Sequence, residues 1–381
     1  MYGEKGERVL EPPTDRLICN LKSIRKTGGL SQSQLAKLAG VQRQAIYDLE
    51  SGRYMPNTSV ALRLAKHLNC RVEDLFSIEE PDIKQPVTLL GEAAQAGSRL
   101  CLGRVRDRLV GFALDGKEML NNTLQAADGF FNPDSGSIRL FQAETCFGQT
   151  ALLLGCDPAF SILSSHVGRR TRDARVICRF SSSFRALDGL ASGVAHLAGT
   201  HLHNTRQGEA NLILARSSLG NTKATILAFS FFEEGLMVAP GNPHGIRTVV
   251  DLAGSGVRFV NREEGAALRI LLDEHLARAA VRTEAISGYS NLVPNHAQGA
   301  LMVTFALADA ALGLRAIAVA HGLDFIPIEA VRCDLVIPSD LMDHPAVKMI
   351  LDVLQTRAFR EELASLPGYE SSSTGKVIGT I

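Results

Sequence analysis

The residues best suited to chemistry with a partner lie near the N-terminus, in the short run Gln42-Arg43-Gln44. Arginine pairs bidentately with guanine and glutamine with adenine, so this run carries side chains that can read base edges in DNA. Residues 12–78 contain ten lysines and arginines against five aspartates and glutamates, whereas the chain from residue 79 onward contains 28 against 32. A small basic head on a mildly acidic body fits nucleic-acid contact by the head alone.

Other chemistry is poorly represented in the sequence. The chain has no G-x-S-x-G elbow, no G-x-x-x-x-G-K-[ST] phosphate loop and no H-E-x-x-H motif, and the pair His201-x-His203 lacks a clear third metal ligand. The seven cysteines are widely spaced, without a C-x-x-C pair, at Cys19, Cys70, Cys101, Cys146, Cys156, Cys178 and Cys333. This pattern favours neither a disulfide framework nor a zinc module. We therefore expect no catalysis, no metal and no cofactor.

The length and composition indicate a globular chain of several domains. The sequence has 381 residues, more than one compact domain usually holds, with 45% apolar residues and balanced charge. No run approaches eighteen consecutive apolar residues, and the N-terminus is charged where a signal peptide would be apolar. The expected location is the cytoplasm.

The head, predicted as residues 12–78, reads as five short helices. Leu17, Leu21 and Ile24 recur at helical spacing and predict a first helix that ends at Gly28-Gly29. Ser31 is expected to cap a second helix, and Gly40 to make the sharp turn before a third. Gly52 and Pro56 end the third helix, a fourth starts at Thr58 or Ser59, and a fifth supplies Val72, Leu75 and Phe76 to the core.

The run from Gly29 to Pro56, G-L-S-Q-S-Q-L-A-K-L-A-G-V-Q-R-Q-A-I-Y-D-L-E-S-G-R-Y-M-P, resembles the Cro/C1-type (XRE family) helix-turn-helix of phage repressors. The resemblance implies that the third helix lies in the major groove of operator DNA. By position, the residues that would read bases are Gln42, Arg43, Gln44 and Asp48, with Tyr47 alongside. Those that would hold phosphates are Gln32, Arg53 and Asn57. Arg25 and Glu50 match a structural salt bridge of that family.

The body is predicted to be α/β. Residues 79–86 (EEPDIKQP) are acidic and contain proline, as an exposed linker would. Residues 87–148 read as a small β-rich segment, because short apolar runs alternate around the polar turns R-D-R and P-D-S-G-S. From Ala151 onward, apolar β-type runs alternate with helical stretches, which favours a parallel sheet.

Residues 151–381 resemble the periplasmic-binding-protein-like domain, of the molybdate-binding class, that is fused to helix-turn-helix heads in cytoplasmic regulators. The segments that carry the resemblance are G-C-D-P-A (Gly155 to Ala159), A-G-T-H-L (Ala198 to Leu202), E-x-G-L-M-V-A-P-G-N-P-x-G-I (Glu233 to Ile246), V-R-F-V-N-R (Val257 to Arg262), A-D-A (Ala308 to Ala310) and G-L-D-F-I-P-I (Gly322 to Ile328). This implies a two-lobed type II fold over residues 149–381, with lobe I at about 149–236 and 326–381 and lobe II at about 237–325. Two crossing strands are expected near 233–239 and 324–328.

The ligand of such a domain would lie between the lobes, where helix N-termini favour anions. Candidate binding residues, chosen as positions just after strands, are Cys156, Asp157, Ser181, Ser182, Ser183, Thr200 and His201 in lobe I, and Asn261, Glu264, Gly265, Arg269, Tyr289 and Asp309 in lobe II. The chain departs from the usual G-S-G-T-R-like anion loop with G-A-A-L-R (Gly265 to Arg269), which lacks the hydroxyl donors. The effector could therefore be an oxyanion such as molybdate or tungstate, or a small organic metabolite.

Together these features predict a homodimeric, ligand-responsive regulator that binds double-stranded operator DNA. One recognition helix reads few base pairs, and a dimer supplies two half-sites. The alternative is a cytosolic small-ligand-binding protein with a vestigial DNA head. A gel shift at two salt concentrations separates the two, because specific DNA binding survives non-specific competitor.

Overall fold

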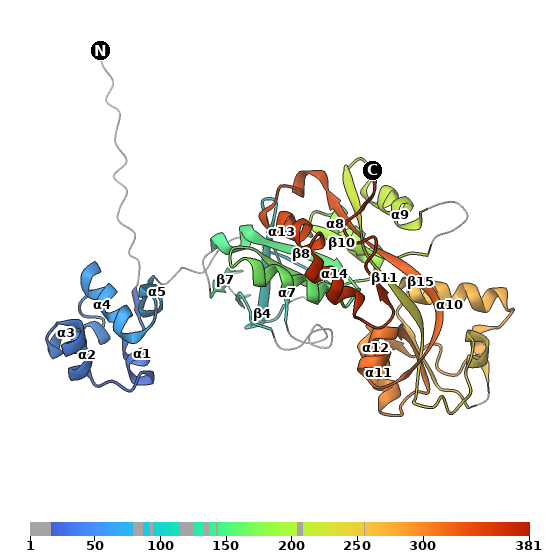
Figure 1. Cartoon of the computed structure of the whole chain (residues 1–381), viewed down its shortest axis with the longest axis horizontal. Helices are drawn as coiled ribbons and strands as arrows, with labels where there is room; N and C mark the ends of the chain where they lie inside the picture. Colours follow the sequence, from blue (N-terminus) through green and yellow to red (C-terminus); the bar gives the residue numbers. More distant parts are fainter. Residues whose placement is uncertain are drawn as a thin grey trace, which may run out of the picture. The chain divides into compact units, whose positions relative to one another are not determined.

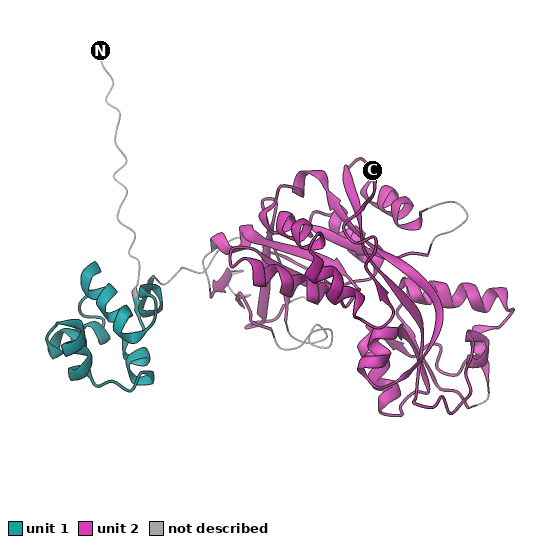
Figure 2. Ribbon diagram, in the orientation of Figure 1, with its two compact units in different colours: residues 1–82 teal, residues 83–381 magenta. Residues whose placement is uncertain are grey.

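The computed structural model divides the chain into two compact units, residues 1–82 and 83–381 (Figure 2). It describes residues 17–78, 87–91, 94–114, 125–132, 137–141, 144–203, 209–254 and 256–381. The predicted linker, residues 79–86, lies outside these ranges. In the described part of the chain, no helix combines the length and the apolar character needed to cross a membrane.

The first unit is the helical head. Its helices are α1 (Leu21–Thr27), α2 (Gln32–Ala39), α3 (Arg43–Glu50), α4 (Thr58–Leu68) and α5 (Val72–Leu75). Ser31 and Gln34 form a reciprocal capping box at the start of α2, and Gly40 ends α2 in the left-handed conformation that favours glycine. Leu35, Ile46 and Leu64 are fully buried between α2, α3 and α4. The predicted helix-turn-helix is confirmed.

Two predictions for the head were wrong. Leu17 does not belong to the first helix but to strand β1 (Leu17–Cys19), and Phe76 does not belong to the fifth helix but to strand β2 (Phe76–Ile78). The two strands pair antiparallel, and Asn20 N donates to Leu75 O beside them. Helical spacing of Leu17 with Leu21 suggested one helix, but pairing between the two ends of the head satisfies the backbone of both segments.

The second unit opens with a five-stranded sheet of order β3-β5-β4-β6-β7. Its strands are β3 (Val87–Leu89), β4 (Arg99–Val105), β5 (Arg108–Ala113), β6 (Gly129–Asn132) and β7 (Ser137–Leu140). One face packs against Leu152, Ile177 and Val194 of the main body. The small β-rich segment predicted from sequence is therefore present and is joined to the main body by apolar contact.

The main body is built on a ten-stranded sheet whose central path is β13-β12-β14-β11-β15-β10-β8-β9. Lobe I contributes β8 (Thr150–Gly155), β9 (Arg175–Phe180), β10 (Leu197–Thr200), α7 (Phe160–Arg170), α8 (Ser183–Ala191), α9 (Ala210–Leu219), α13 (Pro345–Leu354) and α14 (Arg357–Ala364). Helices α7, α13 and α14 share one buried cluster, and α8 and α9 share another, so the sheet is covered on both faces. Strands β16 (Tyr369–Glu370) and β17 (Val377–Thr380) pair with β11.

Lobe II contributes β12 (Phe259–Arg262), β13 (Leu292–Val293), β14 (Ala310–Leu314), α10 (Ala267–Arg278), α11 (His296–Thr304) and α12 (Arg315–Ala320). Short 3-10 turns lie at Glu144–Gln149, Val249–Ala253, Thr283–Ala285 and Ser339–Leu341. Helix α10 packs in one apolar cluster and α11 with α12 in another. The sheet is mixed rather than purely parallel, because β11 runs antiparallel to both β14 and β15.

Two long strands connect the lobes, β11 (Ala224–Val238) and β15 (Asp324–Pro338), which curve side by side through the body (Figure 1). They contain the predicted crossing segments but extend well beyond them. Their pairing has two irregularities, at Ala228/Ser230 and at Glu234/Gly235. At the second, a Cβ on Gly235 would lie 2.1 Å from the carbonyl oxygen of Ile326, so only glycine fits this close approach.

Candidate functional site

The first candidate site is the outer surface of α3 in the head. Gln42 stands at the N-cap of α3 with extended backbone, and Gln42, Arg43 and Gln44 are all exposed. Tyr47 is also exposed, and the Gln44 amide donates to the Asp48 carboxylate at 3.0 Å. The residues expected to read bases therefore share one solvent-facing surface around the start of this helix.

The residues expected to hold phosphates surround the same helix but differ in their contacts. The Arg53 guanidinium lies 5.9 Å from the ring centre of Tyr47. The Gln32 amide donates to the Glu50 carboxylate at 2.9 Å, and Asn57 caps α4 by accepting from the Val60 amide at 2.9 Å. Gln32 and Asn57 thus have roles within the fold whether or not they also touch DNA.

The scaffold prediction for Arg25 and Glu50 is confirmed. Arg25 donates from Nε and Nη2 to the two carboxylate oxygens of Glu50, at 2.5 and 3.0 Å, and from Nη1 to the Leu30 carbonyl. Both side chains are less than one-tenth exposed. This bidentate pair ties α1 to α3 and so fixes the position of the predicted recognition helix.

The second candidate site is a cavity of about 230 Å³ between the lobes. Lobe I supplies the loop after β8, the start of α7 and the end of β9, and lobe II supplies the start of α11 and one residue of α12. The lining residues are Gly155, Cys156, Asp157, Pro158, Phe160, Ser161, Cys178, Arg179, Phe180, Asn295, His296, Ala297 and Ile317. Any molecule held there would touch both lobes.

Two glycines allow the lobe I wall to form. A Cβ on Gly155 would lie 2.5 Å from the Phe160 ring, and one on Gly199 would lie 2.3 Å from it. The Phe160 ring therefore packs directly on the backbone of two glycines, near the ends of β8 and β10. This packing brings Cys156, which follows Gly155, close to His201, which lies two residues beyond Gly199.

A row of buried polar groups runs inward from the cavity. Cys156 Sγ lies 3.2 Å from His201 Nδ1, and His201 Nε2 lies 3.4 Å from a Glu234 carboxylate oxygen. Burial alone would lower the pKa of His201, but the Cys156 sulfur and the Glu234 carboxylate raise it well above its usual value. Burial likewise opposes ionisation of Glu234, but His201 and His203 lower its pKa to about 2.

The facing side of the cavity is supported by a buried arginine. Arg262, at the end of β12, donates from Nη1 to the His296 ring at 3.0 Å and from Nη2 to the Pro294 carbonyl, and its guanidinium lies over the Phe180 ring. Burial lowers the pKa of Arg262, and burial together with Arg262 lowers that of His296 well below its usual value. Among the described residues no carboxylate lies within 4.0 Å of Arg262, and its Nε has no hydrogen-bond partner.

The other lobe I candidates lie close to the cavity but are largely occupied. Asp157 accepts from Ser230, Tyr369 and the Ala159 amide, and burial raises its pKa despite these donors. Ser182 is the N-cap of α8, as expected for a helix start, and Ser183 accepts from the His201 amide. Ser181 follows Phe180 of the cavity wall, and the buried Thr200 hydroxyl has no partner among the described residues.

The lobe II candidates form a separate group. Arg269 donates to the Arg262 carbonyl at 3.2 Å and lies over the Tyr289 ring, and Tyr289 donates to Asp273. Gly265 has a φ of +80°, and Glu264 is 88% exposed. Of the described residues that line the cavity, none belongs to this group.

Two further lobe II candidates are held by backbone neighbours. The Asn261 side chain accepts a hydrogen bond from the Arg262 amide and donates one to the Tyr289 carbonyl. Asp309 precedes β14 instead of following a strand, which corrects the premise on which it was chosen, and Arg258 lowers its pKa to about 2. Both side chains are therefore engaged in holding the ends of lobe II strands.

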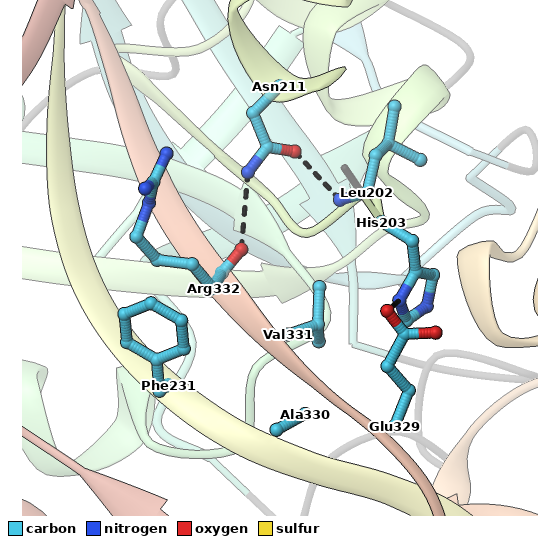
Figure 3. Close-up of a pocket in the computed structure, with 8 residues that line it drawn as sticks. All are labelled: Leu202, His203, Asn211, Phe231, Glu329, Ala330, Val331 and Arg332. Carbon is cyan, nitrogen blue, oxygen red and sulfur yellow. Dashed lines mark hydrogen bonds and ion pairs between the residues drawn. The ribbon is translucent and has the colours of Figure 1, made fainter. Parts of the chain in front are cut away.

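A smaller pocket lies beside the crossing strands (Figure 3). In it the His203 ring faces Glu329, with 3.6 Å between Nδ1 and a carboxylate oxygen, and Asn211 links the Leu202 amide to the Arg332 carbonyl. His203 Nε2 lies 2.8 Å from Glu234, the same buried carboxylate that contacts His201.

Sequence analysis did not select Glu234, Arg262 or His296. Arg262 ends the quoted segment V-R-F-V-N-R, and its place at the C-terminal end of a buried strand was a usable signal. Glu234 lies inside a long apolar strand and His296 begins a helix, and neither position is distinguished by local spacing. Their role emerges only from the pairing of distant strands.

Comparison with known proteins agrees with this architecture. Residues 164–355, about half of the chain, match a family model described as a PBP superfamily domain, and residues 21–75 match a helix-turn-helix model. The uncharacterized protein YvgK of Bacillus subtilis is 28% identical over 237 residues, which cover 62% of this chain and 76% of that protein. An HTH-type transcriptional regulator of Archaeoglobus fulgidus is 36% identical over 63 residues, 16% of this chain and 90% of that protein.

Solved structures with a similar fold include Peb3 from Campylobacter jejuni, with a TM-score of 0.42 and 15% identity over 58% of this chain and 99% of that one. An ABC-type phosphate transport receptor from Vibrio cholerae has a TM-score of 0.39 and 14% identity over 57% and 99%. The two family models match the sequence itself, one within each compact unit. The chain therefore belongs to the PBP superfamily and carries an XRE-type helix-turn-helix domain at its N-terminus.

Proposed function

We propose that this protein is a ligand-responsive transcriptional regulator that binds a specific operator through α3 and a small anion in the cavity between its lobes. The observation that carries the proposal is the cavity wall, which is made by both lobes. A ligand in that position binds one arrangement of the lobes better than another, and differential binding is what allows an effector to shift a conformational equilibrium.

The charge of the cavity wall supports an anion. Arg262 lies behind His296 and Phe180, buried and without a carboxylate within 4.0 Å among the described residues. The N-terminus of α11 lines the cavity through Asn295, His296 and Ala297, and helix N-termini favour negative charge. An oxyanion such as molybdate or tungstate and a small organic acid both fit this chemistry, and either remains within the proposal.

The DNA-binding half of the proposal gives a first prediction. Arg43→Ala should weaken operator binding by about 1–3 kcal/mol and relax base preference, because it removes a bidentate donor from the exposed surface of α3. Arg53→Ala should weaken binding to all sequences similarly, as loss of a phosphate contact does. Titration of a selected operator and of base-substituted versions measures both. Unchanged base preference in the Arg43 variant would rule out this assignment of α3.

The effector half gives a second prediction, which compares two arginines. Arg262→Gln should abolish the thermal stabilisation of the protein by its anion and the anion's effect on operator affinity. Arg262 contacts the lining residues His296 and Phe180, whereas the contacts of Arg269, Tyr289 and the Arg262 carbonyl, do not line the cavity. Arg269→Gln should therefore leave both effects in place. The measurements are melting temperatures with molybdate, tungstate, phosphate and small organic acids, followed by operator titrations with whichever anion stabilises the protein.

The coupling in this experiment should be about 1–3 kcal/mol, and it must be reciprocal, so operator DNA should change anion affinity by the same factor. Loss of the response in Arg269→Gln alone would place the effector at the 264–269 loop. A stabilising anion without influence on operator binding would instead favour a small-ligand-binding protein that does not regulate.

We also propose a homodimer, because one α3 helix reads too few base pairs for a specific operator.

A further inference from the structure

Five side chains form a continuous polar row between the larger cavity and the smaller pocket. From Cys156, the row passes through His201 and Glu234 as described above. It continues from Glu234 to His203 Nε2 at 2.8 Å and from His203 Nδ1 to Glu329 at 3.6 Å. Cys156 lines the cavity, whereas the Glu329 side chain is 44% exposed at the other end (Figure 3). The row leads from a buried thiol to a carboxylate that is partly exposed to solvent.

The His201 ring lies directly beside the sulfur, with 3.2 Å between Nδ1 and Sγ. His201 is a cation next to Sγ, because Cys156 and Glu234 raise its pKa in spite of burial. A positive charge beside a thiol stabilises the thiolate, which is the nucleophilic form. Arg262 adds a second positive charge on the lobe II side, where burial lowers its pKa and Cys156, Glu263 and Glu234 act in the opposite direction.

Four other titratable groups lie in the surroundings of the sulfur. Burial raises the pKa of Asp157, of Cys333 on β15 and of Tyr369 on β16, and burial lowers the pKa of His296 on α11. Burial therefore disfavours the charged form of each of these groups. The paired carboxylate, Glu234, lies on the far side of His201 and holds the imidazolium in place.

The cavity limits what can reach the sulfur. Its wall combines the rings of Phe160 and Phe180 with the polar residues Asn295 and His296, and its volume of about 230 Å³ admits a small organic molecule. The apolar part of the wall suits the carbon skeleton of an electrophile, and the polar part suits a carbonyl oxygen attached to it.

We propose that Cys156 is a nucleophilic thiol that covalently captures a small organic electrophile with a double bond activated by a carbonyl group. In the reaction His201 holds the proton of Cys156 as an imidazolium. The sulfur forms a bond to the olefinic carbon, the double bond breaks, and its electron pair forms an enolate. The enolate then takes the proton from His201, so that S and H have added across the double bond. This inference goes beyond the reversible effector site, although it uses the same cavity.

The cavity contains its own control. Cys178 also lines it, but its thiol donates to the Phe160 carbonyl, and burial raises its pKa to about 12. Cys178 therefore shares the access of Cys156 but not its histidine. The exposed Cys146 serves as an accessible standard. Accessibility and activation can thus be separated within one protein.

The test is labelling of the full chain with N-ethylmaleimide, an activated olefin, followed by mass spectrometry of each cysteine between pH 5.5 and 8.5. At pH 6 an ordinary thiol is roughly 0.3% thiolate. We expect Cys156 to react about tenfold faster than Cys146 at pH 6, because His201 lies beside its sulfur, while Cys178 stays unlabelled. His201→Gln should slow labelling of Cys156 about tenfold at pH 6.

The unmodified protein decides the matter even if His201→Gln does not fold. Labelling of Cys156 no faster than that of Cys146 at pH 6, or equal labelling of Cys156 and Cys178, would overturn the proposal. A parallel reaction with hydrogen peroxide separates the electrophile classes: sulfenic acid at Cys156 without maleimide addition would contradict capture of a carbon electrophile. DNA is absent throughout, so failure here leaves the proposed regulator untouched.

Discussion

Replacement of Arg25 by methionine is expected to unfold the head while leaving the second unit folded. Arg25 and Glu50 are a buried, bidentate pair, and loss of one partner leaves an uncompensated charge, which costs about 3–5 kcal/mol. A domain of roughly this size has little more stability than that. Hydrogen exchange read by mass spectrometry should therefore show loss of protection in residues 21–75 and native protection in residues 144–381.

The matched control is Arg71→Met. Arg71 also pairs with a glutamate, Glu73, but both side chains are more than two-thirds exposed and their charges are 3.5 Å apart. Exposed pairs contribute less than about 1 kcal/mol, so this variant should keep the protection of the parent. Equal protection in the Arg25 and Arg71 variants would show that the buried pair does not hold α1 against α3.

The same pair gives the head a dependence on pH. Burial opposes ionisation of Glu50, but hydrogen bonds from Arg25 and Gln32 outweigh it and hold the pKa of Glu50 below its usual value. A carboxyl group with a lower pKa in the folded state adds stability above its unfolded pKa of about 4.3. That contribution is lost as the pH falls through the folded-state value, and the head should lose protection there.

Gly235→Ala is expected to destabilise the second unit by about 3 kcal/mol, the upper end of the range for overpacking. Its Cβ would lie 2.1 Å from the Ile326 carbonyl oxygen and 2.8 Å from the Phe325 ring. The Ile326 carbonyl belongs to paired backbone, so relief requires β11 and β15 to separate at their irregular step. Urea denaturation followed by far-ultraviolet circular dichroism measures the change.

Gly168→Ala is the control for this substitution. Gly168 lies exposed within α7, and no atom comes within 4 Å of an added Cβ. The same chemical change should therefore stabilise the protein by roughly 0.5–1 kcal/mol, through helix propensity. Opposite signs for the two variants are the expected result, and a Gly235→Ala protein as stable as the parent would mean that the strands are not held this close.

The head could be predicted from sequence because its signals are local. Ser31 and Gly40 mark the two ends of the second helix, and the structure places those ends and the start of the fourth helix at Thr58 as predicted. The errors concern Leu17 and Phe76, whose pairing joins residues about sixty positions apart. No spacing within either segment indicates a partner at that distance.

The candidate site was accessible to sequence analysis only in part. Cys156 and His201 lie within the glycine-containing segments G-C-D-P-A and A-G-T-H-L; Cys156 lines the cavity, and His201 contacts it. Glu234 enters the site because the strand irregularity after it changes the register of pairing with β15. Arg262 reaches the site through a strand of the other lobe. The contacts of Glu234 and Arg262 in the site depend on the order of strands in the sheet, which local sequence patterns do not encode.

The paired connection between the lobes also constrains how they can move. Because β11 and β15 are hydrogen-bonded neighbours over their length, the lobes are not joined by independent loops that could swing freely. Bending anywhere along the regular ladder would break hydrogen bonds, whereas the two register shifts already interrupt it. We therefore expect any relative motion of the lobes to centre on these two irregular steps, the second of which adjoins Glu234 and its contacts with His201 and His203.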